Sequence, residues 1–103
     1  MLMTEENWKS LPPLYSQEKK ANGEAIVYVK FFCPWNQWTW YITEGRREEK
    51  LLFGYVVGLE NEYGYVSLEE LESVTGPGGL RIERDRHFTP CPLNAISALK
   101  GQF

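Results

Sequence analysis

Between residues 25 and 66 the sequence contains four short segments with strand character, joined by connections of only a few residues. The segments are rich in β-branched and aromatic residues and comprise residues 25–32, 38–44, 51–58 and 63–66. Parallel strands need crossover connections of a dozen or more residues, whereas antiparallel hairpins need only a few. The short connections therefore predict a meander of consecutive antiparallel strands, which excludes most helical and parallel α/β folds.

Alternation within these segments predicts which side chains face the core. In residues 25–32 one face is wholly apolar and the other is mixed. In residues 38–44 the apolar Trp40 and Ile42 alternate with threonine and tyrosine. Gly54 lies in the middle of the third segment, where a glycine indicates a β-bulge or the close approach of a large side chain to the backbone.

The clearest helix signal follows the fourth strand segment. Ser67 and Glu70 have the spacing of a capping box, and Val66 and Leu71 have the spacing of a hydrophobic staple. The pair at residues 76–77, a glycine followed by a proline, is a typical helix stop. We therefore expect a helix that begins at Ser67 and ends near residue 75.

Weaker signals predict the remaining elements. Thr4 can cap a short first helix that Pro12 and Pro13 end. Residues 80–88 have a strand pattern, and Pro92 can open a last helix. The expected order is α-β-β-β-β-α-β-α in one domain of 103 residues. We expect an α+β fold in which a curled antiparallel meander of four to five strands packs with two or three short helices, leaving one face partly open.

Charge and hydropathy narrow the classes of partner. The chain has 11 basic and 14 acidic residues, a formal net charge of −3, and so no basic surplus for the phosphates of duplex DNA. This charge is also modest for a protein that mimics DNA with a dense field of carboxylates, and it disfavours that class without excluding it. The sequence begins without a signal-peptide pattern, and no run approaches the roughly 18 apolar residues of a membrane span. We expect a cytoplasmic protein that does not bind membranes.

The cysteines and the single histidine give no clear chemical site. Cys33 and Cys91 are expected to remain free thiols in a reducing compartment. Together with His87 they could supply three metal ligands, but they lack the paired spacing that zinc sites show. The sequence also places no base beside either thiol. We therefore expect no metal, no cofactor and no catalytic residue.

Three further motifs have structural interpretations that are simpler than their functional ones. Residues 81–86 alternate basic and acidic side chains, which favours cross-strand pairing on a solvated face over an anion site. The glycines in residues 76–79 follow a helix, whereas phosphate loops precede one. Residues 12–15 match the PPxY pattern of WW-domain ligands, but the prolines are needed to end the first helix.

The aromatic residues around the first predicted hairpin are the unusual feature of the chain. They are Phe31, Phe32, Trp35, Trp38, Trp40 and Tyr41. About half of them should fill the core. Trp35 and Trp38 are nearest to the polar turn and are predicted to be exposed, as anchors for a protein or as stacking platforms for single-stranded nucleic acid. With Arg84 and Arg86 on a neighbouring strand, they form the candidate interface.

Six segments of the chain also carry a resemblance to a known family. They are residues 12–18, 28–32, 38–41, 53–58, 64–68 and 82–85. In these segments the chain resembles a family of small bacterial proteins described only as a domain of unknown function. The resemblance implies a protein of the kind often encoded on plasmids, conjugative elements and phages, near antirestriction and transfer genes. It implies no activity and no catalytic residue, and neither cysteine belongs to its pattern.

Two functional hypotheses follow. The first is a non-enzymatic accessory protein of a mobile genetic element that binds another protein and inhibits or modulates a host defence complex. The second is a small binding module for single-stranded nucleic acid that uses exposed aromatic side chains. The acidic balance disfavours nucleic acid, and the lack of acid–base and nucleophile groupings disfavours an enzyme. Neither the partner's identity nor the oligomeric state follows from the sequence.

Overall fold

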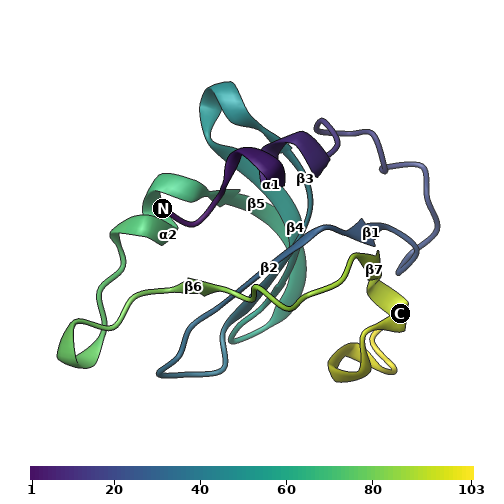
Figure 1. The fold of residues 1–103 in the computed structure, drawn as a ribbon. Helices are drawn as coiled ribbons and strands as arrows, with labels where there is room; N and C mark the ends of the chain where they lie inside the picture. The colour runs from purple at the N-terminus through teal and green to yellow at the C-terminus, as the bar shows by residue number, and fades with distance from the viewer.

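The computed structural model describes all 103 residues and contains two antiparallel sheets and two short α-helices (Figure 1). The five-stranded sheet has the order β5 (Asn61–Ser67), β4 (Leu51–Val57), β3 (Thr39–Arg46), β2 (Val29–Phe32) and β6 (Glu83–Arg84). The small sheet pairs β1 (Ile26–Val27) with β7 (Cys91–Pro92), and the helices are α1 (Glu5–Ser10) and α2 (Leu68–Ser73). The predicted α+β meander is confirmed. None of the helices has the length and apolar character needed to cross a membrane.

Three predicted elements are shorter or more broken than expected. The strand predicted at residues 25–32 is divided, because β1 leaves the main sheet to pair with β7 while β2 stays between β3 and β6. The strand predicted at 80–88 contains only β6, because the Asp85 side chain accepts a hydrogen bond from the His87 backbone N–H and begins a turn. The last helix is replaced by two 3₁₀ turns, Leu93–Ala95 and Ser97–Leu99, on either side of an extended Ile96.

A β-bulge interrupts the pairing of β3 with β4 at Gly54, and this is the first of the two alternatives that the glycine indicates. Ile42 pairs with Gly54, and the next pair along the two strands is Glu44 with Phe53, so β3 has one extra residue at this point. A Cβ on Gly54 would lie 2.0 Å from the carbonyl oxygen of Tyr41, and only glycine allows this close approach. Because neighbouring residues in a strand face opposite sides, the extra residue moves Glu44 to the face of the sheet opposite to Ile42.

One face of the main sheet is covered by the N-terminal segment and both helices. The buried cluster on this face contains Leu2, Met3, Leu11, Val29, Phe31, Cys33, Trp40, Ile42, Leu52, Val66, Leu68, Leu71 and Ile82. Helix α2 contributes its two buried leucines, and Ser67 caps it by accepting a hydrogen bond from the Glu70 N–H at 3.3 Å. The predicted cap is present, but the Glu70 side chain does not return the bond, so only half of the capping box forms.

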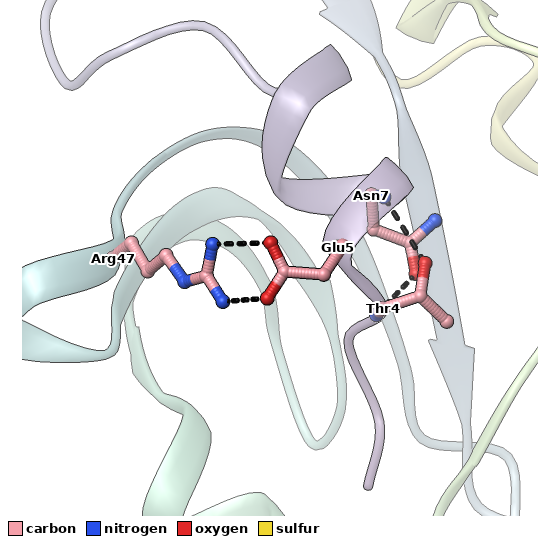
Figure 2. A network of polar contacts seen from close by, with 4 residues as sticks. All are labelled: Thr4, Glu5, Asn7 and Arg47. Atoms are coloured by element: carbon pink, nitrogen blue, oxygen red, sulfur yellow. Dashed lines mark hydrogen bonds and ion pairs between the residues drawn. The ribbon is translucent and has the colours of Figure 1, made fainter.

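Helix α1 is held by polar contacts at its first turn, which Figure 2 shows. Thr4 accepts a hydrogen bond from the Asn7 N–H at 3.1 Å, and its own N–H donates to the Asn7 side chain at 2.9 Å. Arg47, in the 3₁₀ turn Arg47–Glu49 between β3 and β4, donates to both carboxylate oxygens of Glu5. Arg47 thereby holds the pKa of Glu5 below its usual value. The contacts connect α1 to the tip of the β3–β4 hairpin.

The opposite face of the main sheet carries aromatic side chains and is covered in part by the C-terminal turns, yellow in Figure 1. Its buried cluster contains Val27, Tyr41, Tyr55, Leu93 and Leu99. Phe103 packs edge-on against Tyr55, with ring centroids 5.0 Å apart, and also lies against Gly23. The segment at residues 14–24 lies over the rest of this face, toward β5.

Candidate functional site

A cleft of about 500 Å³ opens on the aromatic face, between the segment at residues 14–24 and strands β3 to β5. We call it the tyrosine cleft. Its main lining residues are Tyr15, Gln17, Glu44, Phe53, Tyr63 and Tyr65. The three tyrosines are 51%, 40% and 55% exposed in the order of the sequence, which makes them the most exposed aromatic side chains of the chain. The cleft therefore combines an aromatic wall with an acidic residue.

The aromatic wall comes from the alternation of β4 and β5. Phe53 stands opposite Tyr65 in the register, and their rings meet edge-on with centroids 5.1 Å apart. The ring of Tyr63 is nearly parallel to that of Phe53, with centroids 6.3 Å apart. The Tyr63 hydroxyl also donates to the Asn22 side-chain oxygen at 2.8 Å, which ties the wall to the loop across the cleft. Contacts between rings of this kind add to the stability of the exposed face.

Glu44 forms the acidic part of the cleft, at the position to which the bulge has moved it. Its residue is only 4% exposed, and its two carboxylate oxygens accept hydrogen bonds from the N–H groups of Tyr15 and Gln17, both at 2.8 Å. No lysine or arginine pairs with it, since the three ion pairs of the structure are Lys30–Asp85, Arg46–Glu49 and Arg47–Glu5. Two backbone N–H groups are thus the only partners of a buried carboxylate.

The loop opposite β5 is held in one conformation by these contacts. The Gln17 side chain is buried, donates to the carbonyl oxygens of Ile26 and Thr43, and accepts from the Ile26 N–H at 2.7 Å. Tyr15 has a φ of 73°, a left-handed conformation that few non-glycine residues adopt. Such strain persists only where surrounding contacts enforce it, and it is concentrated at functional sites.

The hydroxyl of Tyr65 remains protonated near neutral pH, because its pKa is raised. The hydroxyl of Tyr65 donates to that of Tyr15 at 3.4 Å, and this hydrogen bond is the main cause of a raised pKa for Tyr65. Partial burial and the nearby Glu44 raise the pKa of Tyr65 further, while Arg46 acts in the opposite direction. Tyr65 therefore presents a neutral phenol ring in the same cleft as the Glu44 carboxylate.

The two tryptophans predicted to be exposed are half-buried. The indole of Trp35 lies flat over Gly76, where an added Cβ would be 2.5 Å from the ring. The indole of Trp38 covers Gly58 in the same way, and its ring centroid is 5.9 Å from that of Trp40. Both indoles also pack against the core cluster under the helices. The turn is on the surface as expected, but glycines from two other connections provide flat backbone against which the rings pack.

Arg84 and Arg86 lie on and just after the strand that neighbours β2, as predicted. Arg84 stands opposite Phe31 in the register and donates a hydrogen bond to the Leu2 carbonyl oxygen, so it holds the N-terminal segment. Arg86 is exposed and lines a groove of about 820 Å³ together with Arg84 and His87. Neither Trp35 nor Trp38 lines this groove, so the four candidate residues do not share one concave surface.

The family of the chain follows from comparison with known sequences. A family model described as a protein of unknown function (DUF2958) matches residues 2–99. The chain belongs to the DUF2958 family. The match spans nearly the whole chain and confirms the resemblance that the six sequence segments indicate. No curated protein and no solved structure gives a significant match.

The cysteines of this DUF2958 protein lie apart from the cleft. Cys33 is buried in the core cluster, and Cys91 is half-buried in β7, where burial raises the pKa of its thiol. Both are free. No group of three or more histidine, cysteine or carboxylate side chains is placed so that it could hold a metal ion.

Sequence reasoning about this DUF2958 protein missed the tyrosine cleft. The signal for its wall was present, because alternate positions in the third and fourth strand segments place Phe53, Tyr63 and Tyr65 on one face. Glu44 could not be assigned in this way, because its face depends on where the bulge inserts its extra residue. Tyr15 lies in a connection with no periodicity to place it.

Proposed function

We propose that this DUF2958 protein is a non-enzymatic accessory protein that binds another protein. We further propose that it acts in the bacterial cytoplasm on behalf of a mobile genetic element, by inhibiting or modulating a host defence complex. The observation that supports protein binding is the group of three exposed tyrosines around one cleft. Tyrosine is enriched at protein interfaces, because its ring provides rigid contact area and its hydroxyl a hydrogen bond.

The position of the cleft beside a sheet edge supports the same proposal. β5 pairs with β4 alone, so its outer side is free of a neighbouring strand over seven residues. A strand of another chain can add to such an edge through main-chain hydrogen bonds, while side-chain pockets beside it provide specificity. Tyr63 and Tyr65 belong to this strand and also line the cleft. One partner segment could therefore engage the edge and the cleft together.

An affinity pull-down of the tagged protein from its bacterial host tests the proposal. We expect the wild type to capture a defined protein partner and the double variant Tyr63→Ala/Tyr65→Ala to lose it. Leu59→Ala is the matched control, because Leu59 is a large apolar residue that is 93% exposed in the β4–β5 turn, outside the cleft. Failure of the wild type to capture any protein would overturn the proposal.

Two further arms of the same experiment locate and classify the interaction. Arg86→Ala tests the candidate interface that the sequence predicts, at Trp35, Trp38, Arg84 and Arg86. If the Arg86→Ala variant lost the partner and the tyrosine double variant still captured it, the interface would lie at that end of the sheet. Nuclease treatment before capture, and fluorescence anisotropy with labelled single-stranded oligonucleotides, test base stacking on the aromatic side chains. We expect no effect of nuclease and no binding of the oligonucleotides.

A further inference from the structure

Glu44 is the one buried acidic residue of the chain, and it lines an open cleft. An ionised carboxylate has about four positions at which it can accept hydrogen bonds, and the N–H groups of Tyr15 and Gln17 occupy two of them. Backbone N–H groups satisfy hydrogen-bonding capacity but carry no net charge. A buried negative charge without a cation is costly, so a cationic group that enters the cleft gains an attraction that this chain leaves unused.

The wall of the cleft favours the same kind of ligand group. The faces of tyrosine and phenylalanine rings attract cations that lie within about 6 Å of the ring centroid. Phe53, Tyr63 and Tyr65 present such rings next to Glu44, and the raised pKa of Tyr65 keeps its hydroxyl neutral near pH 7. A guanidinium group suits this arrangement better than an ammonium group, because it is planar, weakly hydrated and able to stack on a ring while donating to a carboxylate.

The other charged groups at the cleft do not cancel this preference. Glu18 and Lys20 both line the rim, are exposed, and have opposite charges. Arg46, at the end of β3, acts to lower the pKa of Tyr65, but its guanidinium group donates a hydrogen bond to Glu49 at 3.1 Å. The buried carboxylate therefore determines the sign of the charge at the base of the cleft.

We infer that the tyrosine cleft binds an arginine side chain of the partner protein, with its guanidinium group between Glu44 and the rings of Phe53, Tyr63 and Tyr65. This inference rests on the proposed protein-binding function and adds the chemistry of the residue that is recognised. The partner segment that follows the β5 edge would place one arginine in the cleft. Lysine would bind there more weakly, and neutral side chains would not be selected.

The test uses small probes, so that it does not depend on knowing the partner. The isotope-labelled full-length protein is titrated with Nα-acetyl-arginine amide up to about 50 mM, enough to saturate a site with a dissociation constant of a few millimolar. The aromatic NMR signals of Phe53, Tyr63 and Tyr65 are followed. Nα-acetyl-citrulline amide is the neutral control of nearly the same shape, and Nα-acetyl-lysine amide tests the preference for guanidinium. We expect saturable shifts with arginine and at least about tenfold weaker binding of citrulline.

Two variants connect the binding to the cleft. Tyr65→Ala should weaken arginine amide binding by about tenfold, whereas Tyr65→Phe keeps the ring and should bind as the wild type does. Glu44→Gln should abolish the preference for arginine over citrulline. Glu44 also holds the segment at residues 14–24, so the thermal melt of the Glu44→Gln variant is measured first. If that variant is unfolded, the two Tyr65 variants provide the test.

The outcomes separate this inference from the proposed function. Equal binding of arginine and citrulline amides, or no shift of the three aromatic signals with arginine, would overturn the inference. The inference would also be overturned if excess arginine amide failed to displace a captured partner and the Tyr65→Ala variant still bound it. The proposal of protein binding itself would then stand. Loss of the captured partner on addition of arginine amide, but not of citrulline amide, would support both.

Discussion

The two faces of the main sheet use aromatic side chains in different ways. On the helix-covered face, Trp35 and Trp38 lie flat over glycines and pack against the core. On the opposite face, Tyr63 and Tyr65 belong to an edge strand and remain exposed around a cleft. A surface turn does not by itself expose an indole, because the indole can pack flat against a glycine of another connection. On an edge strand the outward positions have neighbours on one side only, so large rings there keep exposed area unless a loop covers them.

The bulge in β3 links the two faces, and Gly54→Ala should therefore have the largest effect. The new Cβ would collide with the backbone of Tyr41, so we expect a loss of at least about 3 kcal/mol in the free energy of unfolding, measured with urea. Gly64→Ala is the matched control, because Gly64 pairs with Gly54 and faces open space. It should be neutral or stabilise by up to about 1 kcal/mol. Equal effects of the two substitutions would show that the bulge does not depend on glycine.

A pair of aromatic truncations tests the contrast between the faces directly. Trp35→Ala removes a half-buried indole that packs against the core, and we expect a loss of about 2–3 kcal/mol. Tyr65→Ala removes an exposed ring and should cost about 1 kcal/mol or less, mainly its edge contact with Phe53. Thermal melts together with the pull-down show whether stability and binding separate. A melt of Trp35→Ala that matches the wild type would return this indole to the candidate interface.

Removing the cap of α2 tests how much this helix contributes to the stability of the face that it covers. Ser67→Ala removes the acceptor of the Glu70 N–H and should lower the free energy of unfolding by about 1 kcal/mol. Ser97→Ala, at an exposed position outside both α-helices, provides the comparison and should change it little. Chemical unfolding of both variants measures the difference. No difference between them would mean that packing of Leu68 and Leu71 alone maintains the helix.

The ion pair between α1 and the β3–β4 hairpin should have the smallest effect. Because Arg47 lowers the pKa of Glu5, the pair stabilises the folded chain above the unfolded-state pKa of Glu5, and this is lost as pH falls through the lowered value. Arg47→Ala should return the pKa of Glu5 toward its usual value, measured by carboxyl NMR titration. Arg46→Ala should leave it unchanged, since Arg46 pairs with Glu49. Both groups are exposed, so added salt should remove the shift.

Much of the fold could be predicted because it depends on local patterns. The alternation of Trp40 and Ile42 and the cap at Ser67 each follow from residues close together in sequence, and the structure confirms both. Of the two alternatives that Gly54 indicates, the structure shows the bulge. The candidate site could not be predicted in the same way. Its wall follows from the alternation of β4 and β5, but Tyr15 reaches the cleft only through a loop that Glu44 holds.

By itself the sequence determined the antiparallel meander and the helix cap at Ser67, because strand periodicity, caps and short connections act over a few residues. The family resemblance also rests on the sequence alone, in six segments spread along the chain. The tertiary structure decided which aromatic residues are covered and which are exposed. Trp35 meets Gly76 only when two distant connections pack together, and Glu44 reaches the cleft only because one extra residue in β3 reverses its face. Contacts of this kind depend on elements far apart in the chain, and no local pattern records them.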